Sequence, residues 1–141
     1  MALLNYMRNN AQKFNINVIA LNVEHGIRGQ ESLSDTKFVK EYCEKAGVPL
    51  LLYSVNALKK AEAEKLCVEQ AARILRYECF YDAINLKKCD KVATAHHLDD
   101  NVESILFNLF RGTGVKGATG IEKDFNGKII RPFLSVEKLE I

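Results

Sequence analysis

Three short, nearly continuous apolar runs separated by helical patterns constrain the fold more than any other feature of this sequence. The runs are 16–23 (INVIALNV), 49–55 (PLLLYSV) and 91–95 (KVATA). Strands of a parallel sheet are buried on both faces and therefore read as continuous apolar runs. Their alternation with helices predicts an α/β fold with a mostly parallel sheet covered by helices.

Four segments carry apolar residues at the three- and four-residue steps of a helix. They are residues 1–13, 32–46, 67–87 and about 98–110. In the last segment we expect one apolar face to point inward, formed by Val102, Ile105, Leu106 and Leu109. The Asn126–Gly127 pair predicts a small hairpin, and the stretch from Ser135 to Lys138 predicts the start of a further helix.

The composition is that of a soluble globular protein. The 141 residues fit one domain, 1–141, with 48% hydrophobic residues, 27% charged residues and a net charge of +2. The sequence has neither an apolar stretch near the roughly 20 residues that cross a bilayer nor an export leader. The cysteines form no CxxC pair, which favours reduced thiols in a cytoplasmic protein. A net charge this small neither requires nor excludes a nucleic-acid partner.

The stretch from Thr94 to Ser104 (TAHHLDDNVES) follows the third apolar run and opens the last helical pattern. Ligands of an open parallel sheet bind at the carboxyl ends of its strands, where this stretch lies. Asp99, Asp100 and Glu103 share a sector of about 100° on the helix. Three gathered carboxylates suit Mg²⁺ held with a phosphate, or one of them accepts a proton from a nucleophile. The simpler alternative is that acidic residues only cap the helix and complement its dipole.

Directly after that helix comes the stretch FRGTGVKG. Arg111 offers a guanidinium fork for a phosphate, and the glycines on either side of Thr113, Gly112 and Gly114, allow close backbone approach. A glycine-rich helix exit is also a common C-cap and loop. Its closeness in sequence to the acidic residues favours the functional interpretation.

Two further groups are candidates for contact with a nucleotide or with RNA. His25 and Arg28 lie in the stretch EHGIRG after the first apolar run; a surface turn with a solvated arginine is the plain alternative. In the long helical pattern, a band of residues beside the apolar face could contact RNA phosphates and bases. The alternative is that these residues only form intrahelical pairs such as Glu69–Arg73. That band comprises Glu69, Arg73, Arg76, Tyr77 and Phe80.

Several common catalytic signatures are missing. The sequence contains no HExxH motif, no Walker-type GxxxxGK[ST] loop and no Ser-His-Asp ordering that stands out. Hydrolase and metalloprotease functions therefore have no support in the sequence.

Four stretches occur in the order and at the spacing of a known family. They are 25–43 (HGIRGQESLSDTKFVKEYC), 67–77 (CVEQAARILRY), 93–117 (ATAHHLDDNVESILFNLFRGTGVKG) and 131–134 (RPFL). Together they closely resemble the N-terminal domain of tRNA(Ile)-lysidine synthetases, within the PP-loop ATP pyrophosphatase superfamily. The resemblance covers nearly the whole chain. The pattern HHxDDxxE followed by RGTG is fairly specific to this branch, and HGIRGQES adds to that specificity.

The resemblance implies a Rossmann-like fold of the adenine nucleotide alpha hydrolase-like type, with helices on both faces of a parallel sheet. It also implies a two-step ligase reaction in which ATP adenylates the C2 oxygen of the wobble cytidine in a minor isoleucine tRNA. The amino group of free L-lysine would then displace AMP, and Mg²⁺ would offset charge on the released pyrophosphate. No membrane is involved, and a homo-oligomer is compatible with this interpretation.

The resemblance also implies roles for individual residues. The carboxylates would serve as catalytic residues and bind the metal or the lysine amine: Asp99, Asp100 and Glu103. The cofactor would be held by Arg111, on an ATP phosphate, with Gly112, Thr113, Gly114, His96 and His25. The RNA and substrate side would be formed by Arg28, Arg73, Arg76 and Tyr77.

The chain departs from the family pattern at three places. Ser104 replaces a Thr and keeps the hydroxyl, and Cys67 replaces a Ser that would be a better helix cap. The family's signature loop, SGGxDS, is absent together with the N-terminal strand that precedes it. We therefore expect no row of backbone N–H groups for the phosphates, two neighbouring strands with unpaired edges, and little or no activity from this chain by itself.

Two alternative functions remain open. A PP-loop tRNA thiolase also activates a base with ATP, but several of those carry cysteine pairs or clusters that this chain lacks, and HGIRG points away from them. The second alternative is a non-catalytic remnant or binding module that keeps the fold without the ATP loop. Retention of the whole acidic cluster and Arg111 argues against a remnant, whereas tRNA binding without ATP dependence would favour it.

Overall fold

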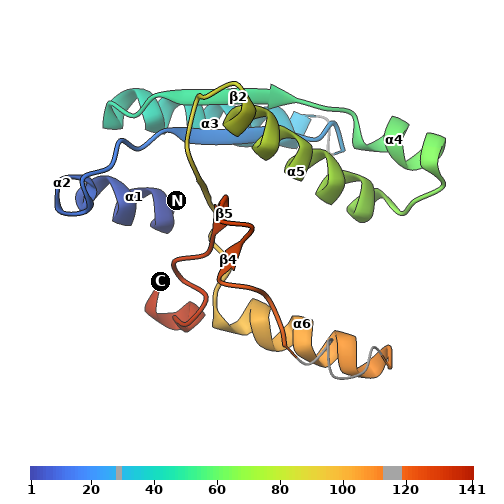
Figure 1. The fold of residues 1–141 in the computed structure, drawn as a ribbon. Helices are drawn as coiled ribbons and strands as arrows, with labels where there is room; N and C mark the ends of the chain where they lie inside the picture. Colours follow the sequence, from blue (N-terminus) through green and yellow to red (C-terminus); the bar gives the residue numbers. More distant parts are fainter. Residues whose placement is uncertain (28–29, 113–118) are drawn as a thin grey trace. The chain divides into compact units, whose positions relative to one another are not determined.

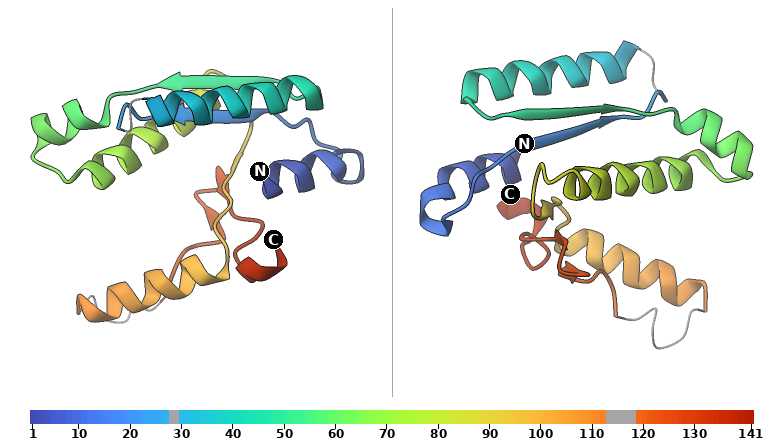
Figure 2. Two further views of the ribbon diagram at one scale, coloured as in Figure 1. Left: turned by 180° about the vertical axis from the view of Figure 1, so that it is seen from behind. Right: turned by 45° about the horizontal axis from the view of Figure 1, so that its top comes forward.

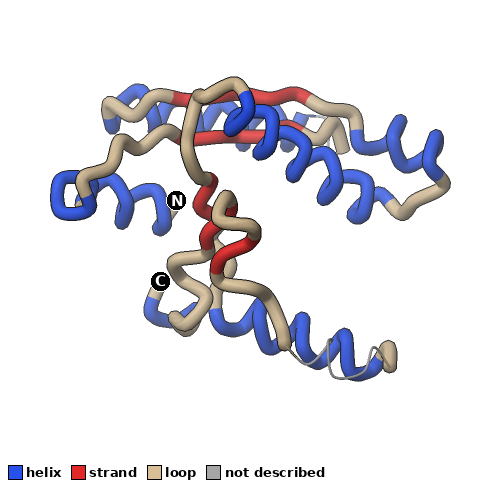
Figure 3. The backbone as a smooth tube through the Cα atoms, viewed as in Figure 1, coloured by secondary structure: helices blue, strands red, loops and turns tan. Residues whose placement is uncertain are grey.

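The chain divides into two compact units. The computed structural model describes residues 1–27, 30–112 and 119–141, apart from the side chains of residues 30, 31 and 33. Residues 7–88 form one unit, and residues 1–6 with 89–141 form the other. Each unit contains both helices and strands (Figure 3). That residues 1–141 make a single domain stays a prediction.

The unit of residues 7–88 is built on two parallel strands, β1 (Ala20–Glu24) and β2 (Leu50–Ser54). The strands pair residue for residue along their whole length, so their carboxyl ends lie at the same edge. α3 (Gln30–Ala46) covers one face of the pair and α5 (Val68–Asn85) covers the other (Figure 1 and Figure 2). A helical crossover between the strands keeps them parallel, as the sequence predicts.

A further helix, α4 (Ala57–Glu64), follows β2 and packs on α5. The Asn56 side chain caps α4 by accepting the Lys59 N–H at 2.9 Å. The Tyr53 hydroxyl donates to Asp82 at 2.8 Å and ties β2 to α5. The buried side chains of the two helices are mostly small: Ala57, Ala61, Ala71, Ala72, Cys79 and Ala83, with Phe80 the exception.

The second unit has a small mixed sheet. β3 (Val92–Ala93) pairs in parallel with β5 (Ile129–Ile130), which also pairs in antiparallel fashion with β4 (Asp124–Phe125). The predicted hairpin is present, with Asn126 and Gly127 both at positive φ, 55° and 66°. The buried apolar side chains of this unit are Leu3, Val92, Ile129 and Leu134.

The strands that open the two sheets each have one unpaired edge. Within the described residues, β1 pairs with β2 alone and β3 pairs with β5 alone. That two neighbouring strands lack a common partner between them stays a prediction. In the part of the chain that the structure describes, no helix has both the length and the apolar character needed to cross a membrane.

Helix and strand ends differ from the sequence prediction at both ends of the chain. The helical pattern of residues 1–13 is divided into α1 (Ala2–Asn9) and α2 (Ala11–Phe14). Asn15 adopts a left-handed conformation that ends α2, so β1 starts only at Ala20. Near the other end, the 3₁₀ helix η1 (Lys138–Glu140) is capped by Glu137 and starts two residues later than predicted.

The predicted inward face of α6 (Leu98–Phe110) is wrong, although the bounds of the helix are correct. Val102 is 47% exposed, Leu106 47% and Leu109 53%. Helical periodicity identifies which residues share a face, but it does not identify what covers that face. The recorded contacts of α6 with the rest of its unit involve its first half: Leu98 N–H donates to Val136, and Gly120 lies against Asn101.

Gly120 and Gly127 provide a matched test of the packing on α6. Both have positive φ, 67° and 66°. A Cβ at Gly120 would lie 2.3 Å from Asn101 Oδ1 and 3.0 Å from Ile105, whereas nothing described lies within 4 Å of one at Gly127. Gly127→Ala should lower the free energy of unfolding by about 1–2 kcal/mol, and Gly120→Ala by about 2–5 kcal/mol, in denaturant titrations. Equal losses would contradict the close packing of Gly120.

Candidate functional site

The predicted site residues fall into two groups, one in each unit. The unit of residues 7–88 holds His25, Arg73, Arg76 and Tyr77. The other unit holds His96, Asp99, Asp100, Glu103, Arg111 and Gly112. Three predicted site residues, Arg28, Thr113 and Gly114, lie outside the described residues.

His25 lies at the edge where the carboxyl ends of β1 and β2 meet. It is the first residue after β1, and its carbonyl accepts the Ala57 N–H at 3.0 Å. That hydrogen bond brings the start of α4 to the same edge. Open parallel sheets bind ligands at this edge, so the position suits the nucleotide role predicted for His25.

Burial and the charge of a cation on α5 favour the neutral form of the His25 imidazole. Its pKa lies below 6.5, chiefly because burial desolvates the ring and also because the Arg76 guanidinium repels the charged form. The Glu24 carboxylate acts in the opposite direction. Nδ1 is buried and has no hydrogen-bond partner among the described residues. α5 therefore places Arg76 within electrostatic reach of the end of β1.

Arg73 and Tyr77 form a stacked pair on α5. The Arg73 guanidinium lies 5.1 Å from the centre of the Tyr77 ring, and its Nη2 donates to the Tyr77 hydroxyl at 3.4 Å. Arg73 thus pairs with Tyr77, one turn further along the helix, and not with Glu69 as the alternative interpretation supposed. The Tyr77 ring also lies 5.6 Å from the Phe80 ring. A cation stacked on aromatic rings suits contact with RNA phosphate or base.

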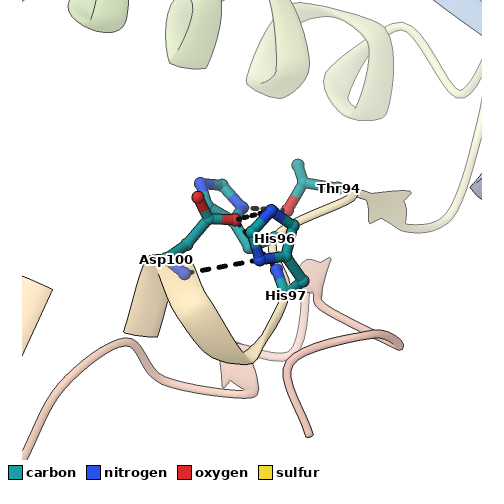
Figure 4. Close-up of polar contacts among 4 residues, drawn as sticks. All are labelled: Thr94, His96, His97 and Asp100. Atoms are coloured by element: carbon teal, nitrogen blue, oxygen red, sulfur yellow. Dashed lines mark hydrogen bonds and ion pairs between the residues drawn. The ribbon is translucent and has the colours of Figure 1, made fainter. Parts of the chain in front are cut away.

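His97 and Asp100 cap the N-terminus of α6 (Figure 4). Asp100 Oδ2 accepts the His97 N–H at 2.9 Å and lies 3.4 Å from Nε2 of the same histidine. His97 Nδ1 accepts the Asp100 N–H at 3.4 Å. Both ring nitrogens of His97 therefore contact Asp100, in the reciprocal pattern of a capping box. Asp100, through its Oδ2, therefore has the capping role that was the simpler alternative for the acidic stretch.

The neighbouring His96 is held differently. Its Nδ1 lies 2.9 Å from the Thr94 hydroxyl oxygen (Figure 4). Thr94 is fixed in turn to β5, because its N–H donates to the Ile130 carbonyl at 3.0 Å. The two adjacent histidines therefore have different environments: His97 caps a helix, and His96 is oriented at the carboxyl end of β3.

The three carboxylates do not form a ready metal cluster. No group of three His, Cys, Asp or Glu side chains among the described residues is placed to hold a metal ion by itself. The reason is local, because Asp100 turns back onto the helix N-terminus while Asp99 and Glu103 are exposed. Mg²⁺ commonly takes one or two carboxylates together with substrate phosphates. The donor set therefore fits Mg²⁺ in the presence of a phosphate ligand, and the metal role stays a prediction.

Arg111 lies at the opposite end of α6 from the aspartates. It is the C-cap residue, and its guanidinium lies 4.3 Å from the centre of the Phe107 ring. At 1.5 Å per residue, the step from Asp99 to Arg111 along the helix is about 18 Å. Closeness in sequence therefore does not place them at one site. Gly112, at φ 70°, donates to the Leu109 carbonyl at 3.0 Å and acts as a helix terminator.

Some residues near these groups were missed from the sequence. Glu24 accepts hydrogen bonds from Gly26 N–H and from the Ser54 hydroxyl. Asn101 Oδ1 accepts the Ile121 N–H at 2.7 Å and fixes the segment after Gly120 to α6. The sequence signal that could have identified such residues is a polar residue at the end of an apolar run, such as Glu24 or Thr94. The ends of paired parallel strands lie together, so polar residues there can contact one another.

A match to a family model shows the family to which the chain belongs. Over residues 1–141 the chain matches the model of the PP-loop domain. The chain therefore belongs to the PP-loop domain family, as the sequence stretches predicted.

Among curated relatives, the chain is 40% identical over 139 residues to the tRNA(Ile)-lysidine synthase of Clostridioides difficile (strain 630), covering 99% of this chain and 30% of the relative. It is 36% identical over 141 residues to the enzyme of the same name from Caldanaerobacter subterraneus subsp. tengcongensis, covering 100% of this chain and 30% of the relative. It is 42% identical over 115 residues to the enzyme of the same name from Bacteroides thetaiotaomicron, covering 82% of this chain and 27% of the relative. The chain thus spans less than a third of the length of these relatives.

A solved structure shares the fold. The U34-tRNA thiolase NcsA from Methanococcus maripaludis, with its 4Fe-4S cluster, superposes with a TM-score of 0.74 at 23% identity. The match covers 96% of this chain and 48% of that chain. Likeness at this identity concerns the fold alone, and it confirms the predicted α/β class.

The pKa of His25 tests its contact with Arg76. Arg76→Gln removes a charge that lowers this pKa, so the pKa measured by NMR titration should rise toward 6.5. Arg73→Gln, the matched control on the same helix, should leave it unchanged. Because the folded pKa lies below the unfolded value, the stability contributed by neutral His25 is full above pH 6.5 and is lost as the pH falls toward the folded pKa. Equal effects of the two variants would contradict the proximity of Arg76.

Proposed function

We propose that this chain is the ATP-using part of an enzyme that joins L-lysine to C2 of the wobble cytidine in a minor isoleucine tRNA. The observation that carries the proposal is the name shared by the relatives above, which are tRNA(Ile)-lysidine synthases at 36–42% identity. Membership of the PP-loop domain family supports ATP as the cofactor. Because the chain spans less than a third of those relatives, its substrates and activity are proposals for the whole protein.

The proposed reaction has two steps that balance. The C2 oxygen of cytidine attacks the α-phosphorus of ATP, and pyrophosphate leaves. The lysine amine nitrogen then attacks C2, the bond from C2 to oxygen breaks, and AMP leaves with that oxygen. The nitrogen loses protons to a nearby base as the new bond forms. Adenylation is needed because it turns a poor leaving oxygen into a good one.

The carboxylates at the start of α6 are proposed to bind the lysine amine or Mg²⁺. Asp99 and Glu103 are exposed, which leaves them accessible to a cation. Among the described residues, both contacts of the Asp100 carboxylate use Oδ2, which leaves Oδ1 for a ligand. Bound Mg²⁺ would offset negative charge on the released pyrophosphate.

Cationic and glycine-rich positions are proposed to hold the nucleotide and the RNA. Arg76 acts electrostatically on His25 at the carboxyl edge of β1 and β2, where an anionic ligand would be attracted. The stacked Arg73–Tyr77 pair suits an RNA backbone or base. The remaining proposed nucleotide or RNA contacts are His96, Arg111, Gly112, Thr113, Gly114 and Arg28.

A tRNA thiolase is the second candidate, because the solved structure with the same fold has that name. The cysteines of this chain argue against it. Burial raises the pKa of the Cys43, Cys79 and Cys89 thiols, which lowers their thiolate fraction. All four cysteines are free, which is consistent with the cytoplasmic location that we propose for a tRNA-modifying enzyme.

Lysine incorporation tests the proposal directly. The full-length product of the gene, supplied with ATP, Mg²⁺ and an isoleucine tRNA with a wobble cytidine, should attach radiolabelled lysine to that tRNA. Glu103→Gln should reduce the rate by about 10²-fold or more, because it removes a charge at the amine or metal. Glu44→Gln, at an exposed glutamate in the last turn of α3 that is not among the proposed site residues, should leave the rate unchanged.

Two further outcomes separate the alternatives. Incorporation of sulfur in place of lysine would establish the thiolase function, and tRNA binding without ATP dependence would favour a binding module. Arg111→Ala should raise the KM for ATP about tenfold or more if its guanidinium holds a phosphate. An unchanged KM would remove Arg111 from the ATP site.

A further inference from the structure

Glu24 connects the ends of the two parallel strands. Its Oε1 accepts the Gly26 N–H at 2.6 Å, and its Oε2 accepts the Ser54 hydroxyl at 3.2 Å. Gly26 follows β1 by two residues, and Ser54 is the last residue of β2. One carboxylate therefore holds the turn after β1 against the end of β2, using both of its oxygens.

Backbone contacts make that turn a defined structure. The Glu24 carbonyl accepts the Val55 N–H at 2.8 Å, so the pairing of the strands extends past their ends. Gly26 has a φ of 67°, and a Cβ there would lie 3.3 Å from the Val55 carbonyl oxygen. Glycine is needed because a side chain would be strained at this φ and crowded by the neighbouring backbone.

The turn carries His25, whose ring has little else to orient it. Nδ1 makes no hydrogen bond to any described residue. The backbone of His25, in contrast, is held on both sides, by the Glu24–Gly26 contact and by its carbonyl to Ala57. The place of the imidazole therefore depends on the turn and not on a bond of its own.

We propose that Glu24 is a positioning residue that fixes the His25–Gly26 turn to β2 and thereby holds the His25 imidazole at the carboxyl edge of β1 and β2. Through His25 it would act on the nucleotide, and that part of the inference rests on the proposed function. Ser54 is the partner that fixes the second carboxylate oxygen. The charged groups that act on His25 are Glu24 on β1 and Arg76 on α5.

Two substitutions separate the geometry of Glu24 from its charge. Glu24→Gln retains an oxygen for the Gly26 N–H but removes the charge that raises the His25 pKa. The His25 pKa should then fall, while the imidazole chemical shifts at high pH, where the ring is neutral, should remain those of the wild type. Glu24→Ala removes both hydrogen bonds, so the neutral-form shifts should change as well. Glu44→Ala on α3 is the matched control and should change neither.

A milder variant keeps the test decisive if Glu24→Ala does not fold. Ser54→Ala removes only the Oε2 contact and should shift the neutral His25 resonances in the same direction by a smaller amount. Neutral-form shifts that are unchanged in Glu24→Ala, or in Ser54→Ala where that is the variant that folds, would overturn the positioning role.

ATP titration separates this inference from the proposed function. ATP should perturb the His25 resonances of the full-length protein, and Glu24→Ala should reduce that perturbation at least severalfold, with Gln largely restoring it. If ATP does not perturb the His25 resonances of the wild type, but the Glu24 variants show the expected His25 shifts without ligand, the positioning role stands and the nucleotide role is overturned. A response equal in wild type and Glu24→Ala would overturn the role of Glu24 toward the nucleotide.

Discussion

The parallel pairing of β1 and β2 determines where the unit of residues 7–88 can carry chemistry. Parallel strands bring their carboxyl ends to one edge, and here the register places Glu24 opposite Ser54. Everything polar that follows the two strands is therefore gathered in a small space: a glutamate, a serine, a histidine and the capped start of α4. α5 is packed on one face of the pair. It carries Arg76, whose charge acts on His25 at this edge.

In the second unit, polar residues also follow the carboxyl end of a parallel strand. β3 ends shortly before the two adjacent histidines. His97 caps α6, whereas His96 contacts the Thr94 hydroxyl. The orphan N–H groups of a helix N-terminus need acceptors, and the His97–Asp100 pair provides them. His96, Asp99 and Glu103 are outside that pair, which makes them the stronger candidates for contact with a ligand.

Sequence reasoning predicted the elements well because apolar periodicity is a local property. The parallel strands, the bounds of α6 and the hairpin at Asn126 were all accessible in this way. It did not predict which side of α6 is covered, since Val102 and Leu106 depend on neighbours that periodicity does not identify. Nor did it predict the strand-end contacts of Glu24, because a hydrogen bond between residues 24 and 54 depends on the strand register.

The candidate site shows the same division between local and long-range information. The stretch HHLDDNVE predicts chemistry as a motif of the family, but the motif does not identify which carboxylate is used by the helix cap. The closeness of Arg111 to the aspartates was inferred from sequence distance. In the structure, the aspartates lie in the first turn of a 13-residue helix and Arg111 is its C-cap. Motifs identify residue types reliably, whereas distances between them require the fold.

The most direct test of the central claim is the fate of the α-phosphate of ATP. The full-length protein should be mixed with ATP labelled at the α-phosphate and with isoleucine tRNA that has a wobble cytidine, in the absence of lysine. Transfer of the label to the tRNA with release of pyrophosphate, followed by release of labelled AMP when lysine is added, is the result expected of an adenylating ligase. Unlabelled tRNA, with ATP intact or cleaved to ADP and phosphate, would contradict it.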